Sequence, residues 1–132
     1  MRNTIYTIVK TEQSFSEQLS VMVIGSYSTF HRAKSSLVEH IIERAQHDAR
    51  FSDALWHDEN SGDELRESVI DDFGNYFCRD EDSVIFPPVV LLPLRKFLGS
   101  SIDGDGTYHV SVGIGASEYT VHYDIVENEL EL

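Results

Sequence analysis

Near the N-terminus, two short stretches carry the residue types that favour β-strands. Residues 5–9 and 19–24 are rich in β-branched and aromatic side chains, and residues 11–18 between them are polar. Such residues fit the pleated, half-buried surface of a sheet. The pattern predicts a β-hairpin with a long polar loop.

Near the C-terminus, apolar residues occupy every second position over residues 108–114 and again over residues 119–125. Side chains in a strand point alternately to the two faces of the sheet, so this alternation is typical of strands with one buried face. Glycine and small residues at 115–117 separate the two stretches. We therefore predict a second hairpin.

The period of the pattern changes in the middle of the chain. Apolar residues recur at spacings of three and four over residues 30–49, which predicts an amphipathic helix. The buried stripe comprises Ala33, Leu37, Val38, Ile41, Ile42, Ala45 and Ala49. Ser28 or Thr29 supplies a hydroxyl to cap the first turn. The expected solvent side holds Glu39, Glu43, Arg44 and Gln46.

A second helix is expected after Ser61, because Ser61 and Glu64 have the spacing of a capping box. Its apolar stripe would comprise Leu65, Val69, Phe73, Tyr76 and Phe77. Between the two helices, residues 50–62 are expected to form an acidic loop with Trp56 as its one large apolar anchor.

The segment between the second helix and the C-terminal hairpin holds all three prolines. Residues 84–86 predict a short strand. Residues 89–98 suit either a buried strand or a short helix. We favour the helix because a proline such as Pro88 is tolerated in a first turn, while Pro93 argues against a long one.

These elements, in the order ββαα(β/α)ββ, predict a single α+β domain over residues 1–132. An antiparallel sheet built from the N- and C-terminal hairpins would pack on the two helices. A chain of 132 residues is large enough for one core. The expected core residues are Ile8, Val21, Leu37, Ile41, Phe73, Tyr108, Val110 and Val121.

Charge is distributed unevenly along the chain. Residues 1–52 hold six Lys/Arg and five Asp/Glu, whereas residues 53–132 hold four and eighteen, and the whole chain has a net charge of −13. Such a protein is expected to repel nucleic acid and anionic membranes and to attract basic surfaces. The single cysteine, Cys78, excludes an internal disulfide and fits a reducing compartment. With no signal peptide or membrane span in the sequence, we expect a cytoplasmic protein.

The acidic excess is concentrated between residues 53 and 82, where eleven acids face two arginines. Asp63, Glu67 and Asp71 follow one another at a spacing of four and would share one face of the second helix. This face is either an ordinary solvated surface or a surface that binds a partner. The expected partner-binding residues are Asp58, Glu59, Asp63, Glu64, Glu67, Asp71, Asp72, Asp80, Glu81 and Asp82.

No residue pattern indicates catalysis, a metal site or a cofactor. His40 and His47 lie seven residues apart, about 10 Å along a helix, which is too far to share one metal ion, so we interpret both as solvated. The sequence Trp56-His57-Asp58-Glu59 places an imidazole beside two carboxylates, but neighbouring loop residues seldom converge on one ion. The turn at 103–107 lacks the final glutamate of a calcium loop. Cys78 is interpreted as a buried, inert thiol.

The first strands and helix share a pattern with known small proteins. The pattern consists of a Tyr-containing strand at residues 5–9, the sequence Gly25-Ser26-Tyr27-Ser28-Thr29 after the second strand, and Ala33 on the helix. It resembles a loose class of small bacterial and phage-borne proteins, as does the closing strand from Tyr119 to Glu127 with Leu130 after it. The resemblance implies the fold and a mobile-element setting, and transfers no catalytic residues.

Three classes of function follow from these observations. The leading hypothesis is a non-enzymatic acidic protein that engages a basic surface of a partner protein, in the manner of an inhibitor or immunity protein against a nucleic-acid-handling protein. The alternative is an assembly module in which a hairpin edge strand pairs to form a homodimer. A small enzyme ranks last, because it would require a pocket where His57 or His109 meets a carboxylate.

Overall fold

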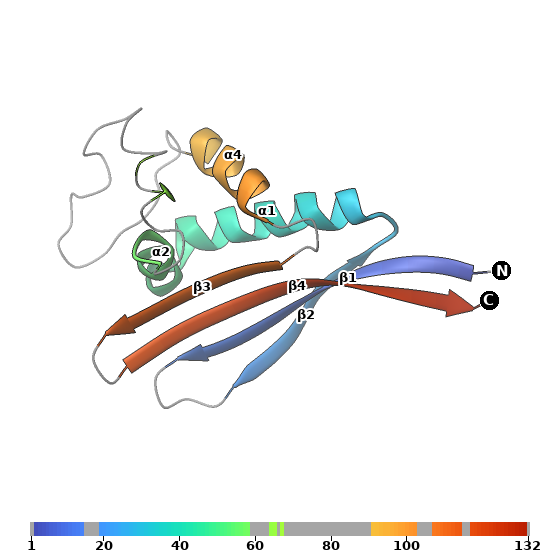
Figure 1. Ribbon diagram of the computed structural model, residues 1–132, viewed down its shortest axis with the longest axis horizontal. Coiled ribbons are helices and arrows are strands. Elements are labelled where there is room, and N and C mark those ends of the chain that lie inside the picture. Colours follow the sequence, from blue (N-terminus) through green and yellow to red (C-terminus); the bar gives the residue numbers. More distant parts are fainter. Residues whose placement is uncertain are drawn as a thin grey trace.

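A computed structural model describes residues 2–14, 19–58, 64–65, 67, 91–102, 107–114 and 117–131 of the chain. Four strands and three helices are assigned within these ranges (Figure 1). In chain order they are β1 (Arg2–Ser14), β2 (Ser20–Tyr27), α1 (Phe30–His47), α2 (Ala49–Trp56), α4 (Leu91–Ser101), β3 (Thr107–Ile114) and β4 (Ser117–Glu131).

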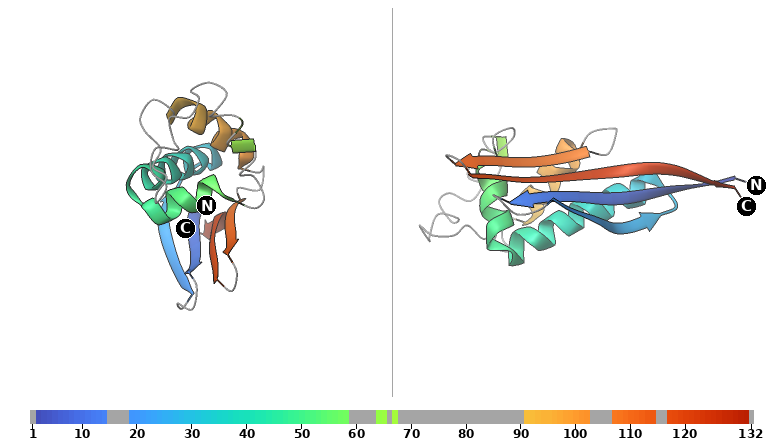
Figure 2. Two further views of the ribbon diagram at one scale, coloured as in Figure 1. Left: turned by 90° about the vertical axis from the view of Figure 1, so that its left-hand side faces the viewer. Right: turned by 90° about the horizontal axis from the view of Figure 1, so that it is seen from below.

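The strands form one antiparallel sheet in the order β2-β1-β4-β3. The two hairpins join through β1 and β4, which pair from Arg2 opposite Glu131 to Ser14 opposite Tyr119. This pairing brings the two chain ends together, and both strands extend past the start of α1 (Figures 1 and 2). The predicted α+β fold, with a sheet made from the N- and C-terminal hairpins, is confirmed.

The long polar loop predicted for residues 11–18 is wrong in its first half. Thr11 to Ser14 continue β1 and pair with β4 on one side, and Thr11 and Glu12 also pair with β2 on the other. A strand with neighbours on both sides has its backbone hydrogen bonds satisfied whatever its side chains are. Pairing therefore overrides the weak strand preference of these polar residues.

Helix α1 begins at its predicted cap. The Thr29 hydroxyl accepts a hydrogen bond from the backbone N–H of Arg32 at 3.1 Å. The predicted apolar stripe is buried at Ala33, Leu37, Val38, Ile41, Ile42 and Ala45. One face of α1 thus covers the sheet, and α4 packs on the other side of α1, away from the strands (Figure 1).

The acidic loop predicted for residues 50–62 is also wrong at its start, because residues 49–56 form helix α2. An Asp48 carboxylate oxygen accepts a hydrogen bond from the backbone N–H of Phe51 at 3.2 Å, which satisfies a free amide of the first turn. Phe51, Leu55 and Trp56 are buried, so Trp56 does act as an anchor. Burial of this apolar face stabilises a helix where the charge pattern alone suggests a loop.

Within the ambiguous segment at 89–98, the described residues from Leu91 onward are helical, as favoured from the sequence, and α4 continues to Ser101. Pro93 lies in its first turn, where a missing N–H costs no intrahelical hydrogen bond. Leu94, Phe97 and Leu98 are buried against the rest of the core. None of the described helices has the length and apolar character that crossing a membrane requires.

Four of the predicted core residues, Ile8, Leu37, Ile41 and Val121, are fully buried. Val21 was predicted wrongly, because its side chain is 65% exposed. Ile8 faces the helices, and Val21 pairs with Thr11, three positions further along β1 and therefore on the opposite face. The register shift between Ile8 and Val9 sets this arrangement.

Other predictions fall outside what the structure describes. The side chains of Tyr108 and Val110 and the whole of Phe73 lie outside it, as does the predicted strand at 84–86. Of the predicted second helix, only residues 64, 65 and 67 are described, and they are helical.

Candidate functional site

Only three of the ten expected partner-binding acids lie within the described residues. Glu64 and Glu67 are exposed, and Leu65 beside them is fully buried. This is the orientation expected of a helix with one apolar and one acidic face. The other seven lie outside the described residues: Glu59, Asp63, Asp71, Asp72, Asp80, Glu81 and Asp82.

Asp58 was wrongly placed among the surface acids. Only 4% of this residue is exposed. It follows helix α2 directly, and its backbone N–H donates to the carbonyl of Leu55 at 3.5 Å. The end of α2 thus turns Asp58 into the protein, where a partner has no access to its carboxylate. The error follows from the unexpected helix, because a loop would have left this side chain in water.

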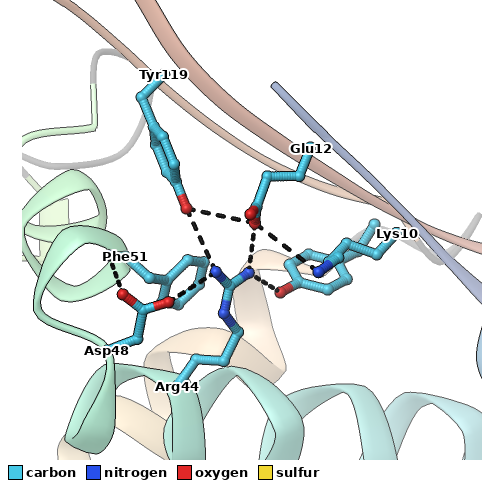
Figure 3. A network of polar contacts seen from close by, with 7 residues as sticks. Lys10, Glu12, Arg44, Asp48, Phe51 and Tyr119 are labelled. Atoms are coloured by element: carbon cyan, nitrogen blue, oxygen red, sulfur yellow. Dashed lines mark hydrogen bonds and ion pairs between the residues drawn. The ribbon is translucent and has the colours of Figure 1, made fainter. Parts of the chain in front are cut away.

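A cluster of polar side chains lies between the sheet and the corner where α1 meets α2 (Figure 3). At its centre, the Arg44 guanidinium donates to Glu12 Oε1 at 2.8 Å and to Asp48 Oδ2 at 2.9 Å. It also donates to the hydroxyl oxygens of Tyr123 at 3.0 Å and Tyr119 at 3.4 Å. One arginine thereby joins a helix to two strands.

Three further contacts complete this Arg44 cluster. The Tyr119 hydroxyl donates to Glu12 Oε1 at 3.3 Å, and the Lys10 ammonium lies 4.0 Å from the same oxygen. The Arg44 guanidinium also stacks over the Phe51 ring, 4.3 Å from its centroid. The fork of an arginine has enough donors to reach all these acceptors at once.

The electrostatics of the cluster favour a charged Arg44 and Asp48 and protonated Tyr119 and Tyr123. Burial opposes the charge on Arg44, but its interactions with Tyr123, Asp48 and Glu12 outweigh burial and raise the pKa of the guanidinium. Burial raises the pKa values of Tyr119 and Tyr123, so both hydroxyls stay protonated. Burial acts to raise the pKa of Asp48, but the hydrogen bond from Arg44 and the backbone N–H of Phe51 lower it overall.

The sequence misplaced Arg44, because the helical pattern put it on the solvent side with Glu43. Its side chain is in fact only 15% exposed. A recognisable signal was present in three pairs of residues. Lys10 and Glu12 follow Ile8 at two-residue steps, so their side chains point to the same face of β1 as Ile8 does. Tyr119 and Tyr123 lie on one face of β4. Arg44 precedes Asp48 by four positions, the spacing at which helix side chains meet.

His40 is half-buried rather than solvated, which corrects the interpretation from the sequence. Its ring packs edge-on against Tyr123, with centroids 5.5 Å apart, and its buried Nε2 has no hydrogen-bond partner among the described residues. Burial, followed by repulsion from Arg44 and Lys10, lowers the pKa of the imidazole. His47, at the end of the same helix, is exposed as expected. No group of three or more potential metal ligands occurs in the part of the chain that is described.

Protonation of His40 should couple stability to pH. Because the folded state lowers the pKa of His40 below its ordinary value of 6.5, the unfolded chain binds this proton first as the pH falls. The contribution of His40 to stability should be complete at pH values well above 6.5, the ordinary pKa, and should decrease as the pH falls below 6.5. Urea denaturation between about pH 8 and pH 5 should show this decrease in wild type and a weaker one in His40→Leu. His47→Leu is the matched control, and an unchanged slope in His40→Leu would contradict the assignment.

Of the six large apolar side chains that are exposed among the described residues, four lie on β2 or just before it. Leu19, Val21, Met22 and Val23 are 57%, 65%, 51% and 62% exposed. β2 is an edge strand of the sheet, and no charged residue occurs between Ser20 and Tyr27. We call Leu19, Val21, Met22 and Val23 the β2 patch. The sequence identified the strand but placed Val21 in the core, because alternation alone does not say which face a helix covers.

A groove of about 300 Å³ lies between α1 and α4. Its lining includes the basic residues Lys34 and Arg95 and the acidic residue Glu39. Glu39 takes two hydrogen bonds from Arg95, at 2.7 and 3.1 Å, and these contacts lower the pKa of its carboxyl. Arg95 and Glu39 are therefore already paired with each other within the groove.

Comparison with known proteins adds no relative from which a function follows. A scan against protein-family models, a search of curated proteins and a search of solved structures found no match to this chain. The function is therefore argued from the residues of the chain itself.

Proposed function

We propose that this chain is a non-enzymatic cytoplasmic binding protein whose acidic region engages a basic surface of another protein. The observation that carries this proposal is the arrangement of Glu64, Leu65 and Glu67. The leucine is fully buried while both carboxylates face solvent, inside the segment where eleven acids face two arginines. An acidic face of this kind attracts a basic partner at long range and accelerates association.

The chemistry of the expected partner follows from the charge. Proteins that handle nucleic acid present basic surfaces that neutralise phosphate. An acidic protein that covers such a surface would compete with the nucleic acid, as an inhibitor or an immunity protein does. The resemblance of the first strands and α1 to phage-borne proteins favours the same setting. The partner class is thus a basic, nucleic-acid-handling protein.

The Arg44 cluster supports a non-enzymatic role. Its carboxylates and hydroxyls accept hydrogen bonds from Arg44, Tyr119 also donates to Glu12, and burial keeps the tyrosines protonated. A general base or nucleophile needs a pKa matched to its task and access to a substrate. The cluster instead joins α1 to the sheet, which is a structural role.

Charge reversal on the acidic face should weaken partner binding strongly. We expect Glu64→Lys/Glu67→Lys to weaken binding at least about tenfold, because reversed charges repel a basic surface. The measurement is retention of proteins from the native cell on immobilised wild type and variant, at about 50 mM and about 500 mM salt. Proteins retained by wild type at low salt should be lost both at high salt and in the variant.

The control is Glu43→Lys at an exposed position on α1, compared with the single variant Glu67→Lys, because both make the same change of charge. Circular dichroism should show native folding in all variants, since these side chains lie on the surface. Equal loss of binding in Glu43→Lys and Glu67→Lys would show that net charge, and not the acidic face, governs retention. Retention that is insensitive to salt would contradict the proposal.

A further inference from the structure

The edge of the sheet at β2 combines two properties of an association surface. β2 is the terminal strand in the order β2-β1-β4-β3, so one side of its backbone faces no other strand among the residues that the structure describes. The β2 patch exposes large apolar side chains along the same edge. Open edges of this kind pair with further strands, and proteins that avoid such pairing place charges or prolines there. β2 has neither between Ser20 and Tyr27.

The side chains of the patch extend around the edge rather than over one face. Val21 and Val23 pair with Thr11 and Val9 of β1 and lie on the sheet face opposite the helices, whereas Met22 pairs with Lys10 on the helix side. Figure 2 shows β2 at one margin of the sheet, with the helices on one face and the other face open. An added strand at this margin would therefore cover apolar groups on both faces.

The charge of the chain indicates which strand occupies the edge. Two copies with a net charge of −13 each repel one another wherever acidic surfaces meet. β2 contributes no charge to such a contact. On the neighbouring strand, Lys10 and Glu12 pair with Met22 and Ser20, have opposite signs and lie 4.0 Å apart. A basic partner would find no carboxylate on this strand to bind. A neutral, apolar edge on a strongly acidic protein therefore suits a second copy of the same chain better.

We propose that two copies of the chain associate through antiparallel pairing of their β2 strands, which joins the two sheets into one. This inference goes beyond the proposed function and does not depend on it. A two-fold axis at Met22 would place each Met22 opposite its counterpart and Val21 opposite Val23 of the second copy. All four valines then meet on the open face, next to Val9 of each sheet, as cross-strand pairs that stabilise a sheet.

The oligomeric state tests this proposal directly. Analytical ultracentrifugation of wild type over about 1–100 µM should show a monomer–dimer equilibrium. Val21→Lys/Val23→Lys should raise the dissociation constant at least about 100-fold, because it buries like charges at the paired edge. Val126→Lys is the matched control, since Val126 is exposed on β4, away from the edge. A wild type that stays monomeric throughout, or a dimer that Val126→Lys weakens equally, would overturn the proposal.

The register has its own test. In a Cys78→Ser background, Met22→Cys should form an intermolecular disulfide on mild oxidation, because opposed residues in antiparallel strands lie about 4.5–5.5 Å apart at Cα, within disulfide range. Val126→Cys should not cross-link. A dimer that forms without cross-linking through Met22→Cys would exclude this two-fold axis.

The salt dependence of association distinguishes the proposed dimer from the proposed binding of a basic partner. Added salt screens the repulsion between two acidic copies, so dimerisation should strengthen, whereas binding to a basic partner should weaken. Glu64→Lys/Glu67→Lys should leave the dimer intact, and Val21→Lys/Val23→Lys should leave partner retention intact. If Val21→Lys/Val23→Lys loses its native circular dichroism spectrum, the single change Val23→Thr, which keeps the β-branched shape, provides the test.

Discussion

Truncating Leu37 or Ile41 to alanine should lower the free energy of unfolding by about 2–5 kcal/mol. Both side chains are fully buried on α1, whose apolar stripe packs with Ile8, Val121 and Tyr123 of the sheet in one core. Removal of either side chain leaves a cavity that the surrounding residues fill only in part. Such a loss is a large share of the about 5–15 kcal/mol that stabilises a domain. Urea denaturation followed by circular dichroism measures it.

Leu92→Ala provides a matched control for this prediction. Leu92 is on α4 and is 68% exposed, so the same change of side chain removes little buried surface. We expect its effect to stay within about 0.5 kcal/mol. A Leu37→Ala variant no less stable than Leu92→Ala would show that α1 does not pack on the sheet as described.

The parts of the fold that were predictable have strong local signals. α1 has a regular apolar stripe and a capping hydroxyl at Thr29, and local hydrogen bonds are enough to fix its start. The C-terminal hairpin has strict alternation over both strands. In these segments, local preference and tertiary packing favour the same structure, which is why a single sequence is sufficient.

The parts that were wrong depend on contacts between distant segments. Thr11 belongs to a strand because β4, more than a hundred residues away, pairs with it. Val21 is exposed because the register shift after Ile8 turns it away from the helices. Neither fact has a trace in the local sequence, since alternation identifies two faces of a strand but not which one is covered.

In the candidate site too, the placements that follow from the local pattern were predicted correctly, and those that depend on contacts between distant segments were not. The exposure of Glu64 and Glu67 followed from the position of Leu65, which the apolar stripe already placed in the core. The burial of Asp58 depends on helix α2, whose stability comes from packing of Phe51 and Leu55 and not from its own propensity. Arg44 lies at the margin of the α1 stripe, where only the acceptors on β1 and β4 determine whether it faces water.

Replacing Arg44 with methionine should cost about 3 kcal/mol of stability, near the lower end of the range for breaking a buried ion pair. Methionine keeps much of the length and apolar character of the side chain, so the loss arises from the missing charge and donors. Glu12 and the hydroxyls of Tyr119 and Tyr123 would each lose their bond to the guanidinium. Asp48 is partly in water, which limits the cost. Arg32→Met, at an exposed position on the same helix, should have a small effect.

A double-mutant cycle separates the two explanations for this loss. If the cost of Arg44→Met comes from stranding the Glu12 carboxylate beneath α1, then Glu12→Met should relieve part of it, because two apolar side chains of similar volume replace an ion pair at little cost. The double variant should then be more stable than the sum of the single changes predicts, with a coupling of about 0.5–3 kcal/mol. Strict additivity would show that Arg44 acts through its other contacts, which are Asp48, the Phe51 ring and the hydroxyls of Tyr119 and Tyr123. In that case the ion pair with Glu12 contributes nothing to holding α1 against the sheet.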